Sequence, residues 1–230
     1  MSNGRICHVD IIVGINGTGK TTWCLQTFSL LAQTRPVYIV HLGTEQAFNV
    51  FPKVSILDRK QVSRIKKGIY QISAHDHIKD VAEKTDVIGW SEEQQKNVIK
   101  KRDVFYFIFQ NLHNAFVVFD DVRNLLGDNM PKSVEDLLIN RRQKMLDLFF
   151  IFHGLNLIPP RLFDYYTLLI VFNTMGKIDR SLHKIPFGET IEKICDIVNE
   201  CSNSIKNAYA IIDPKNLNNI KNIKIEYVKP

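Results

Sequence analysis

The sequence predicts an α/β fold with a mainly parallel central sheet flanked by helices, and three observations lead to it. The strongly apolar runs at 9–13, 115–119 and 145–152 are typical of strands that are buried on both faces. Helical patterns lie between these runs, as in chains that build parallel sheets. The first run is followed by a glycine-rich loop and a helical stretch at about 19–31, which is the strand–loop–helix order of a phosphate-binding loop.

The loop after the first strand fits the pattern G-x-x-x-x-G-K-[ST] at every fixed position. Glycines allow the backbone to curl so that its N–H groups point at phosphate oxygens, and the helix that follows adds partial positive charge. Lys20 is expected to reach the β- and γ-phosphates, and the Thr21 hydroxyl is expected to bind Mg²⁺. The expected nucleotide contacts are Gly14, Asn16, Gly17, Thr18, Gly19, Lys20, Thr21 and Thr22.

Two carboxylates end the second apolar run. Asp120 and Asp121 follow 115–119, and the carboxyl ends of parallel strands are where α/β sheets bind ligands. We expect Asp120 to hold the Mg²⁺ shell and Asp121 to polarise the attacking water. The alternative is a strand that ends in a solvated acidic turn, but the phosphate-binding loop in the same chain favours the functional interpretation.

The third apolar run ends in His153-Gly154-Leu155-Asn156. A polar side chain at this strand end faces the γ-phosphate region in sheets of this kind. We expect His153 to act as the sensor of that phosphate, with Asn156 as the second choice. The alternative for His153 is an ordinary turn histidine.

The remaining elements follow along the chain. Before the second apolar run we expect strands at 37–40, 54–57 and 68–73 and a long helix at 91–111. After it we expect a helix at 133–144, a short amphipathic stretch at 162–166, a strand at 167–172, a helix at 188–201 and closing strands at 208–212 and 223–228. We predict one domain over residues 1–230, with an insertion-like basic region at about 53–90.

Composition excludes several classes of protein. The chain has 230 residues, enough for one α/β domain with a sizeable core. Its four cysteines lack metal-ligand spacing and suggest reduced thiols. No stretch resembles a signal peptide, and no apolar run reaches about 18 residues, so we expect neither secretion nor a membrane span.

The net charge of +6 is uneven along the chain. Residues 53–102 contain 12 Lys/Arg and 7 Asp/Glu, a difference of +5. Such an excess suits a polyanion such as nucleic acid, although a solvated lysine-rich face is the plain alternative. His75 and His77 flank Asp76 in the same region, but two histidines at this spacing are more often ordinary loop residues than a metal site.

Three stretches together resemble the HerA/FtsK-type P-loop ATPases, and in particular the small genome-packaging ATPases of viruses. They are Gly14 to Thr21, Phe116 to Asp121, and the block from Arg141 to Arg161. The last block has an arginine just before a strand, a polar residue at that strand's end, a turn, a short helix and the next strand. The resemblance implies a RecA-like P-loop NTPase fold of the additional-strand type.

The resemblance also implies a homo-oligomeric ring, with a hexamer expected, in which ATP binds between neighbouring subunits. An arginine from one subunit would reach the γ-phosphate of the next, and Arg141 and Arg142 are the matched residues, with Arg142 preferred. The alternative is a surface pair near a helix C-terminus. The family often has glutamine where His153 stands and glutamate where Asp121 stands.

The function expected from all of this is ATP hydrolysis, with ATP and Mg²⁺ bound, that drives viral DNA into a capsid. The expected partners are nucleic acid and a capsid or portal vertex protein, in the host cytoplasm or the virion. One alternative is a nucleotide or nucleoside kinase, which shares the loop and transfers phosphate to a small acceptor. Another is a nucleotide-gated phage assembly factor, which typically carries a membrane segment.

Overall fold

A computed structural model describes most of the chain. The described residues are 6–41, 48, 50–74, 104–126, 130–174, 185–216 and 225–228. The histidines at 75 and 77, the first part of the helix expected at 91–111, and the second half of the region expected at 53–90 lie outside them.

Eight strands form one sheet in the order β3-β2-β4-β5-β1-β6-β7-β8. β1 (Val9–Val13) pairs in parallel with β5 (Asp147–Phe152) and with β6 (Leu168–Phe172). β2 (Pro36–His41) and β3 (Gly68–Ser73) also run parallel. β7 (Ala208–Ile212) is antiparallel to β6, and β8 (Ile225–Tyr227) is antiparallel to β7. The predicted α/β fold with a mainly parallel sheet is therefore confirmed.

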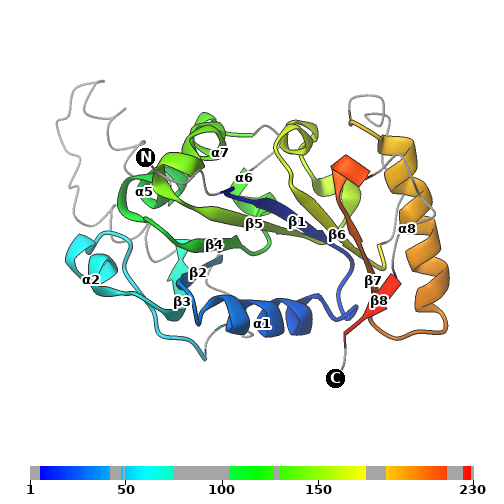
Figure 1. The fold of residues 1–230 in the computed structure, drawn as a ribbon, viewed down its shortest axis with the longest axis horizontal. Helices are drawn as coiled ribbons and strands as arrows, with labels where there is room; N and C mark the ends of the chain where they lie inside the picture. Colours follow the sequence, from blue (N-terminus) through cyan, green and yellow to red (C-terminus); the bar gives the residue numbers. More distant parts are fainter. Residues whose placement is uncertain are drawn as a thin grey trace. The chain divides into compact units, whose positions relative to one another are not determined.

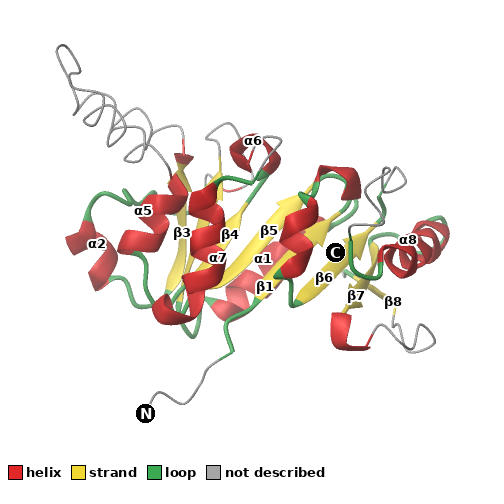
Figure 2. Cartoon of the chain, turned by 90° about the horizontal axis from the view of Figure 1, so that it is seen from above, coloured by secondary structure: helices red, strands yellow, loops and turns green. Residues whose placement is uncertain are grey.

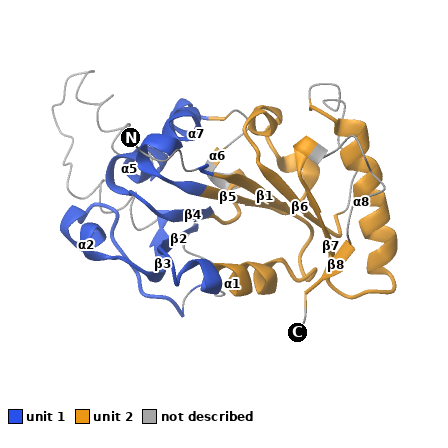
Figure 3. Ribbon diagram, viewed as in Figure 1, with its two compact units in different colours: residues 1–7, 29–118, 131–147 blue, residues 8–28, 119–130, 148–230 orange. Residues whose placement is uncertain are grey.

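The chain divides into two compact units (Figure 3). Unit 1 comprises residues 1–7, 29–118 and 131–147, and unit 2 comprises residues 8–28, 119–130 and 148–230. That the whole chain acts as one ATPase domain stays a prediction.

Unit 2 is organised around β1, whose five residues are all buried. Burial on both faces explains why β1 and β5 are mostly apolar in the sequence, each with one buried aspartate, Asp10 and Asp147. Helix α8 (Gly188–Ser202) packs against β6 and β7 (Figure 1). Its buried residues Ile191, Ile194, Cys195 and Val198 recur at helical spacing, so one stripe of the helix faces the sheet. α1 (Lys20–Leu31) and the short α6 (Arg123–Leu126) complete the helices that bear on the site.

Unit 1 holds α2 (Arg59–Arg64), α5 (Val104–Asn111) and α7 (Lys132–Lys144). α5 and α7 lie side by side (Figure 2). β4 (Phe116–Phe119) follows α5, and its four residues are buried, as the apolar run predicts. α7 ends at Met145, whose φ of 55° and ψ of 41° are left-handed and stop the helix two residues before β5.

Most expected elements are confirmed, but the strand expected at 54–57 is wrong. Only Lys53 forms a bridge, with Gln71 of β3. The chain then turns at Ile56 and Leu57, and the Asp58 carboxylate accepts a hydrogen bond of 2.9 Å from the Gln61 amide. This N-cap starts α2, so no length is left for a strand.

Between β5 and β6 the chain forms two short 3₁₀ helices, at Leu155–Leu157 and Pro160–Asp164, and a third 3₁₀ helix lies at Pro214–Asn216.

All four cysteines are free thiols. Within the described ranges no helix is both long and apolar enough to cross a membrane. The same ranges contain no group of three or more His, Cys, Asp or Glu side chains placed to hold a metal ion.

Candidate functional site

The glycine-rich loop joins β1 to α1 and is held at the ends of both neighbouring strands. The Gly14 amide donates to the Phe152 carbonyl at 3.2 Å, and the Ile15 amide donates to the Asn173 carbonyl at 2.9 Å. A Cβ added to Gly14 would lie 2.6 Å from the Phe172 Cβ, so only glycine lets the loop approach β6 this closely.

Gly19 closes the loop and begins α1. Its φ is +87°, a conformation that residues with a Cβ rarely adopt. An added Cβ would also lie 2.8 Å from the Asn207 Cβ and Cγ atoms. The carbonyl of Gly19 accepts the Trp23 amide at 2.9 Å, which is the first turn of the helix. Sterics and backbone conformation therefore both require glycine here.

Lys20 is the charged group at the centre of the site. The residue is only 6% exposed, and its ammonium donates to the carbonyl oxygens of Gly14 and, at 2.7 Å, Ile15. Burial lowers the pKa of Lys20, while the neighbouring Cys24 and Asp120 oppose that shift. A buried ammonium with a depressed pKa is poised to gain from contact with anionic phosphates.

Three threonine hydroxyls surround this lysine in the sequence. The Thr18 hydroxyl donates to the Ile15 carbonyl at 2.8 Å and so braces the loop from within. Thr21 and Thr22 are exposed on the first turn of α1, beside exposed Asn16 and Gly17. The hydroxyls of Thr21 and Thr22 are therefore accessible to a ligand.

Two carboxylates follow β4 in the turn that leads to α6. Asp120 is 8% exposed and lies close enough to Lys20 and Cys24 to raise the pKa of both groups. Asp121 has a φ of 45°, a left-handed conformation that costs a residue with a side chain about 1 kcal/mol. The Val122 amide donates to the Ile151 carbonyl of β5, which ties the turn to that strand.

His153 follows β5 and faces the second carboxylate. Its Nε2 lies 3.7 Å from Asp121 Oδ1, and its buried Nδ1 has no hydrogen-bond partner among the described residues. Asn156 is exposed in the 3₁₀ turn that follows. The structure thus brings His153 to the acidic turn, and its role as the sensor of the γ-phosphate stays a prediction.

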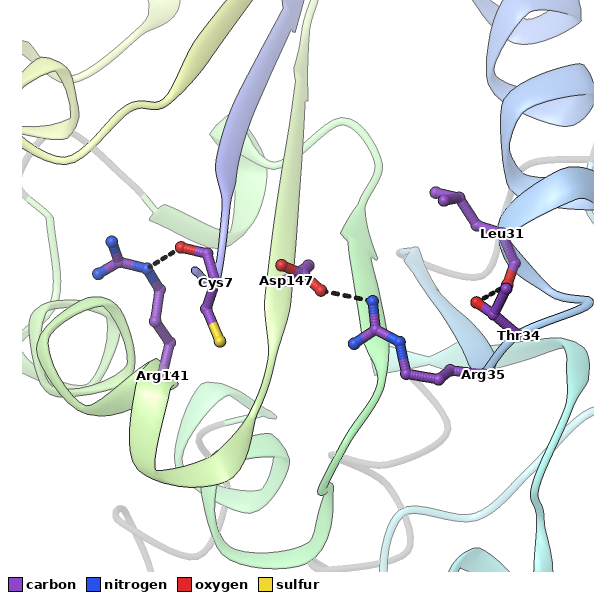
Figure 4. A network of polar contacts seen from close by, with 6 residues as sticks. All are labelled: Cys7, Leu31, Thr34, Arg35, Arg141 and Asp147. Carbon is purple, nitrogen blue, oxygen red and sulfur yellow. Dashed lines mark hydrogen bonds and ion pairs between the residues drawn. The ribbon is translucent and has the colours of Figure 1, made fainter. Parts of the chain in front are cut away.

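The two arginines differ in their surroundings. The Arg141 side chain donates to the Leu138 carbonyl. It also donates to the Cys7 carbonyl at 3.3 Å (Figure 4). It therefore fastens the end of α7 to the residues before β1. Arg142 is exposed in the same turn. Both arginines belong to unit 1, whereas the loop, the two carboxylates and His153 belong to unit 2.

Two residues at the loop were not anticipated from the sequence. Cys24 is fully buried one turn after Lys20, and burial raises the pKa of its thiol, so it stays neutral. Asn207 packs on Gly19. The helical spacing of Lys20 and Cys24 could have indicated the first contact, but no local pattern indicates the second.

The residues of unit 2 fit a magnesium–nucleotide complex. Mg²⁺ prefers oxygen ligands, which the Thr21 hydroxyl and the Asp120 carboxylate supply, and it commonly binds through one or two carboxylates plus substrate phosphates. The buried Lys20 ammonium supplies the cation for the phosphates themselves. An ammonium, a hydroxyl and two carboxylates together can bind a nucleoside triphosphate with its magnesium ion.

Comparisons with known proteins support the fold. No protein-family model and no curated protein matches the sequence. The genome packaging NTPase B204 from Sulfolobus turreted icosahedral virus 2, solved with ATP-gammaS, is similar with a TM-score of 0.61 at 14% identity, over 97% of this chain and 98% of that one.

Two other structures have similar scores. B204, the DNA-packaging ATPase from Sulfolobus Turreted Icosahedral Virus, has a TM-score of 0.60 at 15% identity, over 96% of this chain and 98% of that one. VirB4 of Thermoanaerobacter pseudethanolicus has a TM-score of 0.55 at 10% identity, over 100% of this chain and 91% of that one. At these identities the similarity shows the fold, and that fold is the one the sequence resemblance implied.

Proposed function

We propose that this chain is an ATP-hydrolysing nucleic-acid translocase that packages a viral genome, DNA, into a capsid. The observation that carries the hydrolytic part is the buried Lys20 ammonium in a glycine loop, with Asp120 beside it and the Asp121–His153 pair at the neighbouring strand ends. The fold similarity to the two packaging enzymes supports the same conclusion.

Each residue of the site has one task in this proposal. Lys20 binds the β- and γ-phosphates, and Thr21 and Asp120 hold Mg²⁺, which neutralises phosphate charge when bound. Asp121 accepts a proton from the attacking water. His153, next to Asp121, senses the γ-phosphate. A neighbour's arginine completes the site, and we prefer Arg142 because Arg141 is already engaged with two backbone carbonyls.

The contact with nucleic acid is assigned to a basic surface on unit 1. Residues 53–70 contain six Lys/Arg and one Asp/Glu. Four of the basic residues, Lys60, Arg64, Lys66 and Lys67, are exposed and form no ion pair with the described residues. We call these four the α2 basic surface.

The α2 basic surface borders a shallow concavity of about 560 Å³, lined among others by Lys60, Arg64, Lys66 and Tyr70. The Lys66 ammonium donates to the Ser63 carbonyl at 3.0 Å, and the Tyr70 hydroxyl donates to the Lys67 carbonyl at 3.1 Å. The first bond keeps the Lys66 ammonium at the end of α2, close in sequence to Arg64, and a phosphate backbone would relieve the repulsion between such neighbouring cations.

The first test concerns hydrolysis. Lys20→Ala should abolish ATP hydrolysis and weaken ATP binding, because it removes the cation aimed at the β/γ oxygens. Lys20→Met should also abolish hydrolysis and weaken ATP binding, but it should not lower the melting temperature. Burial destabilises the charged form of Lys20, and this variant removes that charge. Steady-state phosphate release measures the effect, with Lys193→Ala at an exposed position of α8 as the matched control. Wild-type turnover in the Lys20 variants would reject the proposed site, and phosphate transfer to a nucleoside instead of water would indicate a kinase.

The second test concerns the polymer. Replacing Arg64, Lys66 and Lys67 with Gln should lower DNA-stimulated ATPase activity more than basal activity. The slope of log Kobs against log salt for DNA should also shrink by about one unit for each lost phosphate contact. The control replaces three exposed lysines of unit 2, Lys193, Lys206 and Lys215, which changes the net charge equally. Equal losses in both triple variants would mean that only net charge matters.

A further inference from the structure

A second contact with the nucleotide is indicated by the position of Asn207. We infer that Asn207 binds the nucleoside part of the nucleotide, its ribose or base, and so determines which nucleotides the loop accepts. The inference rests on the proposed nucleotide site and adds a residue that neither the loop motif nor the carboxylates supply.

The strand order of unit 2 says which side of the loop the nucleoside occupies. The groups assigned to the terminal phosphate are His153, after β5, and Asp121, after β4, and both strands lie on the same side of β1. The triphosphate therefore extends toward β5, and the nucleoside must leave the loop on the opposite side. That side belongs to β6 and, beyond it, β7.

β7 delivers Asn207 to this place because it runs antiparallel to β6. An antiparallel strand begins at the edge of the sheet where its parallel neighbours end, and the loop lies at that edge. Asn207 immediately precedes β7. Its side chain lies against Gly19, where an added Cβ would be 2.8 Å from Cγ and 3.1 Å from Oδ1.

The carboxamide of Asn207 is held there by its backbone and is available to a ligand. Its φ is 62°, in the left-handed region that asparagine tolerates better than most residues. The carbonyl of Asn207 accepts the Val228 amide at 3.2 Å, which joins this turn to the end of β8. The side-chain amide has no hydrogen-bond partner among the described residues, and it offers two donors and one acceptor.

An aromatic cluster fixes Asn207 relative to the loop. Trp23 of α1 packs edge-on against Phe172 and Tyr209, with ring centroids 6.5 Å and 6.2 Å apart. Phe172 and Tyr209 stack with centroids 5.2 Å apart. A Cβ added to Gly14 would meet the Phe172 Cβ, so Phe172 lies close behind the start of the loop, and Tyr209 lies two residues after Asn207. The cluster therefore links the loop and α1 to the start of β7. Such a support leaves a contact residue with little freedom and makes it selective.

The experiment compares ATP with inorganic triphosphate, which has the phosphates but no nucleoside. Binding of each to the full chain with Mg²⁺ is measured by isothermal titration calorimetry. Asn207→Gly keeps the left-handed backbone and removes the amide, and it should weaken ATP about tenfold while leaving triphosphate unchanged. Asn207→Asp keeps the shape but loses the two N–H donors, so it should weaken ATP if those donors bind the base, whereas a ribose hydroxyl could still donate to the carboxylate.

The control variant is Asn114→Gly, the same change at another left-handed asparagine (φ 48°), located in unit 1. It should alter neither affinity. Titrations with GTP and with 2′-deoxy-ATP then separate a base contact from a ribose contact. If Asn207 binds the base, the difference in affinity between ATP and GTP should disappear in Asn207→Gly. If Asn207 binds the ribose 2′-hydroxyl, the difference between ATP and 2′-deoxy-ATP should disappear instead.

Two results would overturn the inference. Unchanged ATP affinity in Asn207→Gly would show that the amide makes no contact, and equal losses for ATP and triphosphate would show that it only shapes Gly19. Failure of the proposed function gives a different result. The wild-type protein would then not bind triphosphate, and Lys20→Ala would not alter the affinity for ATP.

Discussion

At the scale of single residues, the site depends on groups held in costly states. Lys20 is charged but buried, and its pKa is lowered because burial disfavours the charge. A folded-state pKa below the unfolded value means that the charged ammonium opposes folding. This cost is full below the lowered pKa and shrinks as the pH rises from there to the unfolded-state pKa. Asp121 adds backbone strain at a φ of 45°. Such costs are typical of sites that are organised for a ligand.

The two carboxylates should respond differently to the same change. Asp121→Asn should keep MgATP bound and slow turnover by about 100-fold or more, because an amide cannot accept the proton of water. Asp120→Asn should instead weaken nucleotide binding and raise the Mg²⁺ concentration needed for it. Binding and turnover are measured at several Mg²⁺ concentrations, with exposed Asp196→Asn of α8 as the control. Identical behaviour of the two variants would show that the division of roles is wrong.

At the scale of elements, the start of β5 depends on one ion pair within unit 1 (Figure 4). Arg35 Nη2 lies 2.7 Å from Asp147 Oδ2, and the two side chains are 16% and 4% exposed. The Arg35 guanidinium also sits 3.8 Å above the Phe116 ring. The Asp147 amide donates to the Ala115 carbonyl at 3.0 Å, so the pair lies where the backbone of β5 begins.

Breaking this pair from one side should be costly. Asp147→Ala should lower the free energy of unfolding by about 3 kcal/mol, the lower end of the range for buried pairs, because it leaves the partly buried Arg35 charge without its partner. The double variant Arg35→Leu/Asp147→Leu should lose less, since no uncompensated charge is left. Urea unfolding measures both. A double variant that is as unstable as Asp147→Ala would show that packing, not the lone charge, determines the loss.

At the scale of the whole molecule, the proposed ring needs a surface that reaches a neighbouring subunit. The exposed face of α7 carries Arg142 and, one turn earlier, Ile139, which is 59% exposed. An apolar side chain beside an arginine on one helix face suits a contact between proteins, where arginine is enriched. Arg141, in contrast, is used within its own subunit.

The ring is tested by mixing two inactive proteins. Arg141→Ala/Arg142→Ala should keep nucleotide affinity and cut turnover by orders of magnitude, as loss of an arginine finger does. Mixed with Lys20→Ala subunits, it should recover part of the activity, because an intact arginine then meets an intact loop at some interfaces. Arg142→Ala alone should reproduce the loss.

ATPase activity is followed against protein concentration, with mixed assembly checked by light scattering. Mixed rings that form but stay inactive would refute the arginine in trans. The pair would then be a helix-end surface patch.

The sequence alone determined the loop, the two carboxylates and most strands. These features are local: the glycine pattern dictates a backbone shape, and a parallel strand buried on both faces, such as β4, is a short apolar run. The wrong strand at 54–57 shows the limit, because its apolar residues are buried as a strand's would be, yet the Asp58 cap ends the extended segment.

Only the tertiary structure decided which distant residues meet. Asn207 reaches Gly19 because β7 runs antiparallel beside β6, and Asp121 meets His153 rather than Asn156 because of where two strands end. Arg35 pairs with Asp147 for the same kind of reason. Strand order and register set such contacts, and they follow from how all the apolar faces pack together, which no short stretch of sequence contains.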